Sequence, residues 1–192
     1  MDAQFLQEYR KRPNRIEDMQ DRAYDILDKL GMREIAFGGT KIVRILGGFG
    51  IKTYLSVIKP PELSAYIAID PTLEAKFGTN RVACINERYS DGHKRFAIAH
   101  ELAHYLFDYN EDVSPVYYDT YTADQKEPTE EKELRANRFA ACILMPEDIF
   151  VEKYEQGKAS KLRPNMVGYL STYFRVSRRA IERRFQELGI NE

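Results

Sequence analysis

Hydrophobic positions along the first half of the chain predict helices followed by short strands. Apolar side chains between residues 16 and 30 recur three or four positions apart, which predicts an amphipathic helix ending at Gly31. A shorter helix follows Thr40, the expected N-cap, and ends at Gly47 and Gly48. Three strands, each bounded by turn residues, are then predicted over residues 51–57, 65–69 and 81–87.

The second half of the chain is predicted to be mainly helical. From Asp91 to Phe107 apolar residues cover most of the helix surface, which is typical of a helix buried at the centre of a fold. The acidic, tyrosine-rich segment 108–128 has no clear periodicity and predicts a long loop. Thr129 is the expected N-cap of the next helix. The remaining predicted helices span residues 129–144, 146–156, 164–174 and 177–188.

This order of elements predicts an α+β protein in which a small three-stranded sheet packs on a mostly helical body. A chain of 192 residues is long enough for one catalytic domain with a small appendage. We expect the catalytic domain over residues 1–157 and the appendage, a pair of basic helices, over residues 158–192.

Composition restricts the class of protein and the cellular location that we expect. Hydrophobic residues make up 43% of the chain and charged residues 31%, a balance that favours a globular protein over a disordered one. No apolar stretch approaches the roughly 20 residues of a membrane span, and the polar start is unlike a signal peptide. Cys84 and Cys142 are too few for a disulfide framework, so we expect two buried thiols. These features predict a cytoplasmic protein without a membrane segment.

The sequence HELAH, residues 100–104, lies in the predicted central helix. Residues four apart lie on one face of a helix, so His100 and His104 are placed to bind one metal ion together. Glu101 is rotated by one residue on the helix, which lets its carboxylate approach a metal-bound water instead of the metal itself. Buried His and Glu side chains without a partner would cost on the order of several kcal/mol, and a metal would supply that partner. The alternative interpretation is a pair of hydrogen-bonded core or surface histidines.

A catalytic zinc ion commonly has three protein ligands and one open position. Because His93, the remaining histidine, is interpreted as a capping or surface residue, the third ligand is expected to be a carboxylate or, as the weaker option, a cysteine. In the segment EEKELRANRFAACILMP, Glu133 and Asn137 lie on one helix face. Glu133 can therefore bind the metal while Asn137 orients an imidazole. Glu130, one turn earlier, is the second choice.

Two segments carry a resemblance to a known family. The stretch RFAIAHELAHYLF and the later stretch ELRANRFAACILMP resemble the ImmA/IrrE metallopeptidase family, and the similarity extends over roughly residues 16–150. The resemblance implies a zincin-like fold and a gluzincin-like zinc endopeptidase. It assigns His100, His104 and Glu133 as zinc ligands and Glu101 as the catalytic base. It also implies cleavage of a helix-turn-helix transcriptional repressor, which would derepress a mobile element or a stress regulon. Mn²⁺ and Fe²⁺ are alternative metals.

The tyrosine-rich segment between the predicted ligands departs from the family pattern, so substrate selectivity transfers less well than the chemistry. A donor for the developing oxyanion would assist peptide cleavage. The sequence leaves four candidates open: Tyr117, Tyr118, Tyr121 and Arg138.

The C-terminal part of the chain is basic. Residues 158–188 hold eight Lys or Arg against two Glu, which leaves a net charge of +6. The two helices predicted here, joined by the residues RVS, are similar to a helix-turn-helix with Ser177 as the second N-cap, although Arg175 occupies the usual glycine position. The arginines predicted to contact DNA phosphates are Arg178, Arg179, Arg183 and Arg184. The alternative is an appendage that packs on the body or binds an acidic partner.

Two classes of function therefore compete. The first is a zinc endopeptidase, and the second is a non-proteolytic DNA- or repressor-binding regulator with a structural metal site. Glu101 within HELAH favours the peptidase, because a structural site needs no general base and fills its fourth position with another ligand.

Overall fold

The structure is a computed structural model of the whole chain, and it describes residues 1–34, 37–111, 117–122, 130–160 and 165–190. The helices are α1 (Ala3–Lys11), α2 (Met19–Lys29), α3 (Ile42–Gly48), α4 (Glu74–Phe77), α5 (Asp91–Phe107), α6 (Glu131–Leu144), α7 (Glu147–Ala159), α8 (Met166–Phe174) and α9 (Arg178–Glu187). The strands are β1 (Lys52–Ser56), β2 (Leu63–Ile69), β3 (Arg81–Asn86) and β4 (Tyr117–Thr122). This mostly helical arrangement confirms the predicted α+β class.

The sheet has the strand order β1-β3-β2-β4. β1 runs parallel to β3, whereas β2 is antiparallel to both β3 and β4, so the sheet is mixed. The three predicted strands are confirmed, but the prediction of a loop over residues 117–122 is wrong. These residues form β4 because their backbone pairs with a distant strand, with Tyr121 opposite Ala65. The rest of the expected loop, residues 112–116 and 123–129, lies outside the described residues.

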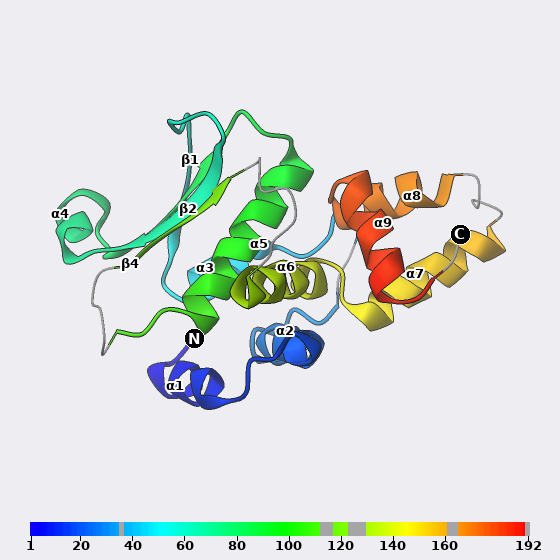
Figure 1. Cartoon of the computed structure of the whole chain (residues 1–192), viewed down its shortest axis with the longest axis horizontal. Coiled ribbons are helices and arrows are strands. Elements are labelled where there is room, and N and C mark those ends of the chain that lie inside the picture. Colours follow the sequence, from blue (N-terminus) through cyan, green and yellow to red (C-terminus); the bar gives the residue numbers. More distant parts are fainter. Residues whose placement is uncertain (35–36, 112–116, 123–129, 161–164, 191–192) are drawn as a thin grey trace.

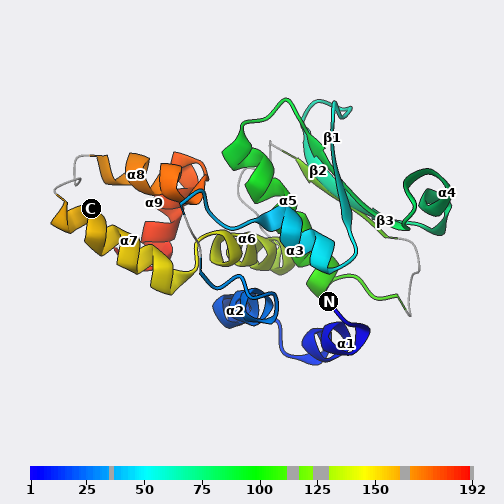
Figure 2. The same cartoon turned by 180° about the vertical axis from the view of Figure 1, so that it is seen from behind.

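Helix α5 forms the centre of the molecule. It lies across the sheet on one side and packs against α6 on the other, and α2 covers α6 from below (Figure 1). Helices α7, α8 and α9 form a group at the end away from the sheet, which is also visible from behind (Figure 2). Side chains from several faces of α5 are fully buried: Ala97, Ile98, Ala99, Leu102 and Ala103. The HELAH sequence therefore lies in a buried part of the fold.

Several local details differ from the predictions. Helix α1 was not predicted, because its segment is polar apart from a few side chains such as the buried Tyr9. Thr40 does not cap α3, since its buried hydroxyl donates to the Ile143 carbonyl at 2.8 Å. Ser177 does cap α9, as predicted, and accepts a hydrogen bond from the Ala180 amide.

Within the described residues every helix is too short or too polar to cross a membrane.

The turn between α8 and α9 packs against the start of α5. A Cβ atom on Gly92 would lie 2.9 Å from the backbone of Val176, so a glycine is needed for this close approach. Arg95 of α5 donates to the carbonyl oxygen of Phe174 at 3.5 Å. Phe174 and other aromatic side chains of these helices belong to the same core cluster as α5 and α6. The helix-turn-helix character of α8 and α9 stays a prediction.

The position of Arg184 contradicts part of the predicted DNA-contacting surface. Its side chain is fully buried, where it donates to Gln20 at 2.5 Å and to Glu187 at 3.0 Å. Because a buried guanidinium cannot reach a phosphate, the prediction of DNA contact is wrong for this residue. DNA contact through Arg178, Arg179 and Arg183 stays a prediction. Cys84 and Cys142 are both buried free thiols, as expected.

Candidate metal centre

Two histidines of α5 and one glutamate of α6 converge at the crossing of these helices. The Nε2 atoms of His100 and His104 lie 2.9 Å apart. The Glu133 carboxylate lies 3.2 Å from each of them, through Oε2 to His100 and through Oε1 to His104. The imidazoles are almost completely buried, and Glu133 is partly exposed. The structure therefore brings together the three residues that the sequence analysis predicted as metal ligands.

Asn137 fixes the ring of His100, as predicted. Its side-chain amide donates to the Glu133 carbonyl at 2.9 Å, which directs Oδ1 toward His100. This oxygen lies 3.2 Å from His100 Nδ1 and accepts a hydrogen bond from the Nδ1–H group. The opposite ring nitrogen, Nε2, is therefore left with a lone pair that faces the convergence point.

Asp108 has the same effect on His104, and sequence analysis missed it. Its Oδ2 lies 2.6 Å from His104 Nδ1, while Oδ1 is paired with the guanidinium of Arg135. Asp108 follows His104 by four residues, so the i, i+4 spacing that identified the histidines also contained this signal. Both imidazoles thus have their Nδ1 protons held by acceptors.

These residues fit a divalent metal ion. Two imidazole lone pairs and a carboxylate meet in a largely buried space, and such acceptors repel one another unless a cation lies between them. Burial lowers the pKa of His100, and the contact with His100 lowers the pKa of Glu133 to about 2. At neutral pH these shifts favour the neutral imidazole of His100 and the carboxylate of Glu133, which are the forms that bind metals. Their candidate ligand atoms all lie within 4.8 Å of one another.

The two other predicted glutamates occupy different positions. Glu101 is completely buried on α5, between the two histidines in sequence. Glu130 is the N-terminal cap residue of α6, has a side chain that is 69% exposed, and pairs with Lys132. The structure therefore places Glu133, and not Glu130, at the imidazoles.

The ring of Tyr121 borders the centre, and His93 packs near that ring. The Tyr121 ring on β4 lies 4.7 Å from the ring of His100, and burial raises the pKa of its phenol. His93 lies near Tyr121 but is neither a cap nor a surface residue: it is half-buried, 2.8 Å from the Ser64 hydroxyl, and stacks on Tyr89. The interpretation of His93 as a capping or surface residue was wrong, because its partner Ser64 lies on β2, a strand distant in sequence.

The four candidate oxyanion donors differ in their position relative to the candidate metal centre. Tyr121 lies beside the candidate metal centre, whereas Arg138 is paired with Glu187. The side chains of Tyr117 and Tyr118 lie outside the described part of the structure.

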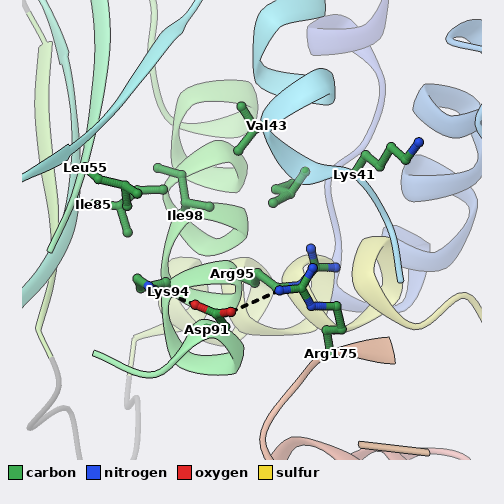
Figure 3. A pocket seen from close by; sticks show the side chains of 10 residues that line it. Lys41, Val43, Leu55, Ile85, Asp91, Lys94, Arg95, Ile98 and Arg175 are labelled. Carbon is green, nitrogen blue, oxygen red and sulfur yellow. Dashed lines mark hydrogen bonds and ion pairs between the residues drawn. The ribbon is translucent and has the colours of Figure 1, made fainter. Parts of the chain in front are cut away.

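A separate groove lies on the other side of α5, between α3, β1 and Arg175 (Figure 3). It has a volume of about 240 Å³, and none of the candidate ligands lines it. Asp91 pairs there with Lys94 at 2.9 Å and with Arg175 at 3.0 Å. Arg95 donates to the Thr40 carbonyl at 2.7 Å. The ion pair between Arg175 and Asp91 therefore links the α8–α9 turn to the start of α5.

Asp108→Asn is expected to weaken binding of a divalent metal ion at this centre by about 10-fold or more, with Zn²⁺ as the test ion, because loss of an outer carboxylate that orients a ligating histidine typically has that effect. The affinity is measured by competition with a chromogenic chelator. Asp21→Asn is the matched control, since Asp21 is an exposed aspartate on α2. Equal zinc affinities for the two variants would show that the contact between Asp108 and His104 does not support the metal.

The fold and the candidate metal centre together indicate the class of protein. A buried pair of histidines four residues apart, with a glutamate from the next helix, is the donor set of a candidate metallopeptidase. The family model of Peptidase_M78, the IrrE N-terminal-like domain, matches residues 51–186. The chain belongs to this family, which supports a metallopeptidase-type function and confirms the resemblance found in the sequence.

A solved structure has a related fold. It is described as a Mycobacterium tuberculosis transcriptional regulator, has 20% sequence identity to this chain, and gives a TM-score of 0.52. The similarity covers 96% of this chain and 52% of the regulator, so the chain spans about half the length of that protein. A search of curated proteins gave no match.

Proposed function

We propose that this protein is a zinc-dependent endopeptidase. The observation that carries the proposal is the convergence of His100, His104 and Glu133 beside a buried Glu101. Membership of a metallopeptidase family supports the same class of function. Mn²⁺ or Fe²⁺ would suit the same nitrogen and oxygen donors, because affinity order alone does not select the metal.

Each residue near the centre has a role in this proposal. When bound by His100, His104 and Glu133, zinc would act as a Lewis acid and make water a nucleophile near neutral pH. Glu101 takes the proton of the attacking water and delivers it to the leaving amide nitrogen. Tyr121 donates a hydrogen bond to the carbonyl oxygen of the scissile peptide bond.

The proposed substrate is a helix-turn-helix transcriptional repressor, whose cleavage would derepress a mobile element or a stress regulon. The family resemblance implies this substrate, and a structure of similar fold is described as a transcriptional regulator. Because such repressors act on DNA in the cytoplasm, we propose that the enzyme acts there as well.

The second candidate function is a regulator that binds its repressor or DNA without cutting. It is favoured by the exposed arginines of α9, Arg178, Arg179 and Arg183, within the basic unit proposed over residues 158–192. In this alternative the metal site is structural and Glu101 has no task. The peptidase is better supported, because three protein donors leave a zinc ion with an open position.

The test of the proposed function compares zinc-loaded protein with protein stripped by a chelator. The substrate is a purified helix-turn-helix repressor encoded near the gene, and the fragments are identified by mass spectrometry. We expect about one zinc ion per chain and cleavage that disappears on chelation and returns with zinc. A protein that stays metal-free after zinc loading, or one that binds zinc and leaves the repressor intact, would contradict the proposal.

A further inference from the structure

A second cavity, of about 180 Å³, begins beside the candidate metal centre. Tyr121 and Asn137 line it, and both contact His100 through ring packing or a hydrogen bond. Its far side is formed by α9, and Phe96 contributes an apolar wall. A peptide bound at the proposed metal centre would therefore have this cavity next to its scissile bond.

Two arginines give this cavity a positive charge. Arg179 and Arg183 are four residues apart on α9, so they lie on the same face of the helix, and both line the cavity. Tyr121, whose ring packs against that of His100, lines the same cavity. The two arginines therefore share this cavity with a residue that contacts a candidate ligand.

The carboxylate in the cavity does not cancel this charge. Glu187 lines the cavity as well, but it is paired with Arg138 and with Arg184. Across the described ranges, Arg179 and Arg183 form no ion pair. A carboxylate ligand would therefore meet two guanidinium groups that have no acidic partner in this part of the chain.

We propose that this cavity is a substrate subsite that selects an aspartate or glutamate side chain next to the scissile bond. This inference rests on the proposed function and adds a substrate class to it, a peptide segment with an acidic residue at one fixed position. An acidic side chain suits the cavity better than a DNA backbone does, because the two arginines line a small pocket with an apolar wall.

The test measures binding to zinc-loaded full-length protein and does not depend on turnover. The probes are short peptide hydroxamates, which anchor to zinc, with glutamate, glutamine or lysine at the first, second or third position from the chelating group. Acetohydroxamate, which has no side chain, reports binding to the metal alone. Each probe is also tested with Arg179→Glu, Arg183→Glu and the control Arg178→Glu, since Arg178 lies on α9 outside the cavity.

At one position the glutamate probe is expected to bind ~10-fold more tightly than the glutamine probe, because its partner groups are charged. High salt should reduce this preference. Arg183→Glu and Arg179→Glu should shift the preference toward lysine, while Arg178→Glu should leave it unchanged, and acetohydroxamate should bind all four proteins equally.

Equal affinity for the three side chains at every position would overturn the inference and leave the proposed function standing. An equal effect of Arg178→Glu and Arg183→Glu would also overturn it. If Arg179→Glu and Arg183→Glu instead reduce only salt-sensitive binding to a DNA duplex, α9 is a DNA-contacting helix. If acetohydroxamate does not bind the zinc-loaded protein at all, both the proposed function and this inference fail.

Discussion

Glu101→Gln is expected to abolish peptide cleavage while the protein keeps its fold and its zinc. Glutamine has the size of glutamate, so it fills the same fully buried position on α5. Its amide cannot take a proton from water, and general-base catalysis typically contributes roughly 10²- to 10⁴-fold to the rate. The measurement is the cleavage rate of the repressor at equal zinc occupancy of wild type and variant.

Glu131→Gln is the matched control, because Glu131 is an exposed glutamate on the helix that carries Glu133, and it should cleave like wild type. This experiment also separates the two candidate functions. If wild type and Glu101→Gln relieve repression equally and neither cuts the repressor, the protein is a binding regulator rather than a peptidase.

Glu133→Ala is expected to remove stoichiometric zinc binding, whereas Glu130→Ala should keep it. Glu133 provides one of the three converging donors, 3.2 Å from each imidazole, so its loss should exceed the roughly 10- to 100-fold effect of an outer-shell change. Glu130 lies one turn earlier, has an exposed side chain, and makes no contact of this kind. Zinc content after equilibrium dialysis gives the direct comparison.

Thermal unfolding of both variants provides the control for folding, since a misfolded Glu133→Ala protein would also lose zinc. Equal zinc loss in two folded variants, or a larger loss in Glu130→Ala, would place the third ligand one turn earlier on α6.

The candidate centre was predictable because its geometry is mostly local. His100 and His104 share one helix face by spacing alone, and Glu133 with Asn137 shows the same relation on the next predicted helix. The sequence did not show how α5 and α6 cross, so the contact between the two pairs was an expectation until the fold was known. Asp108 was missed although its spacing from His104 is equally local.

The remaining differences depend on contacts between distant residues. β4 exists because it pairs with β2, some fifty positions earlier in the chain, and local alternation in an acidic, tyrosine-rich segment does not reveal this pairing. Charge counting placed Arg184 among solvent-exposed arginines, whereas Gln20 and Cys142 surround it in the structure. Burial of a charged side chain is set by tertiary partners, which composition cannot identify.

The anchoring of both imidazoles has a consequence for how the metal would be acquired. The Nδ1 atoms are held by Asn137 and Asp108, and the helices that carry them are fixed by a continuous apolar core. Much of the conformational entropy of arranging the ligands is therefore lost during folding, before any ion arrives. In a zinc finger, by contrast, metal binding itself drives folding. We therefore expect the apoprotein to fold before it binds the ion, so that loading and removal of the ion are a reversible exchange at a preformed site.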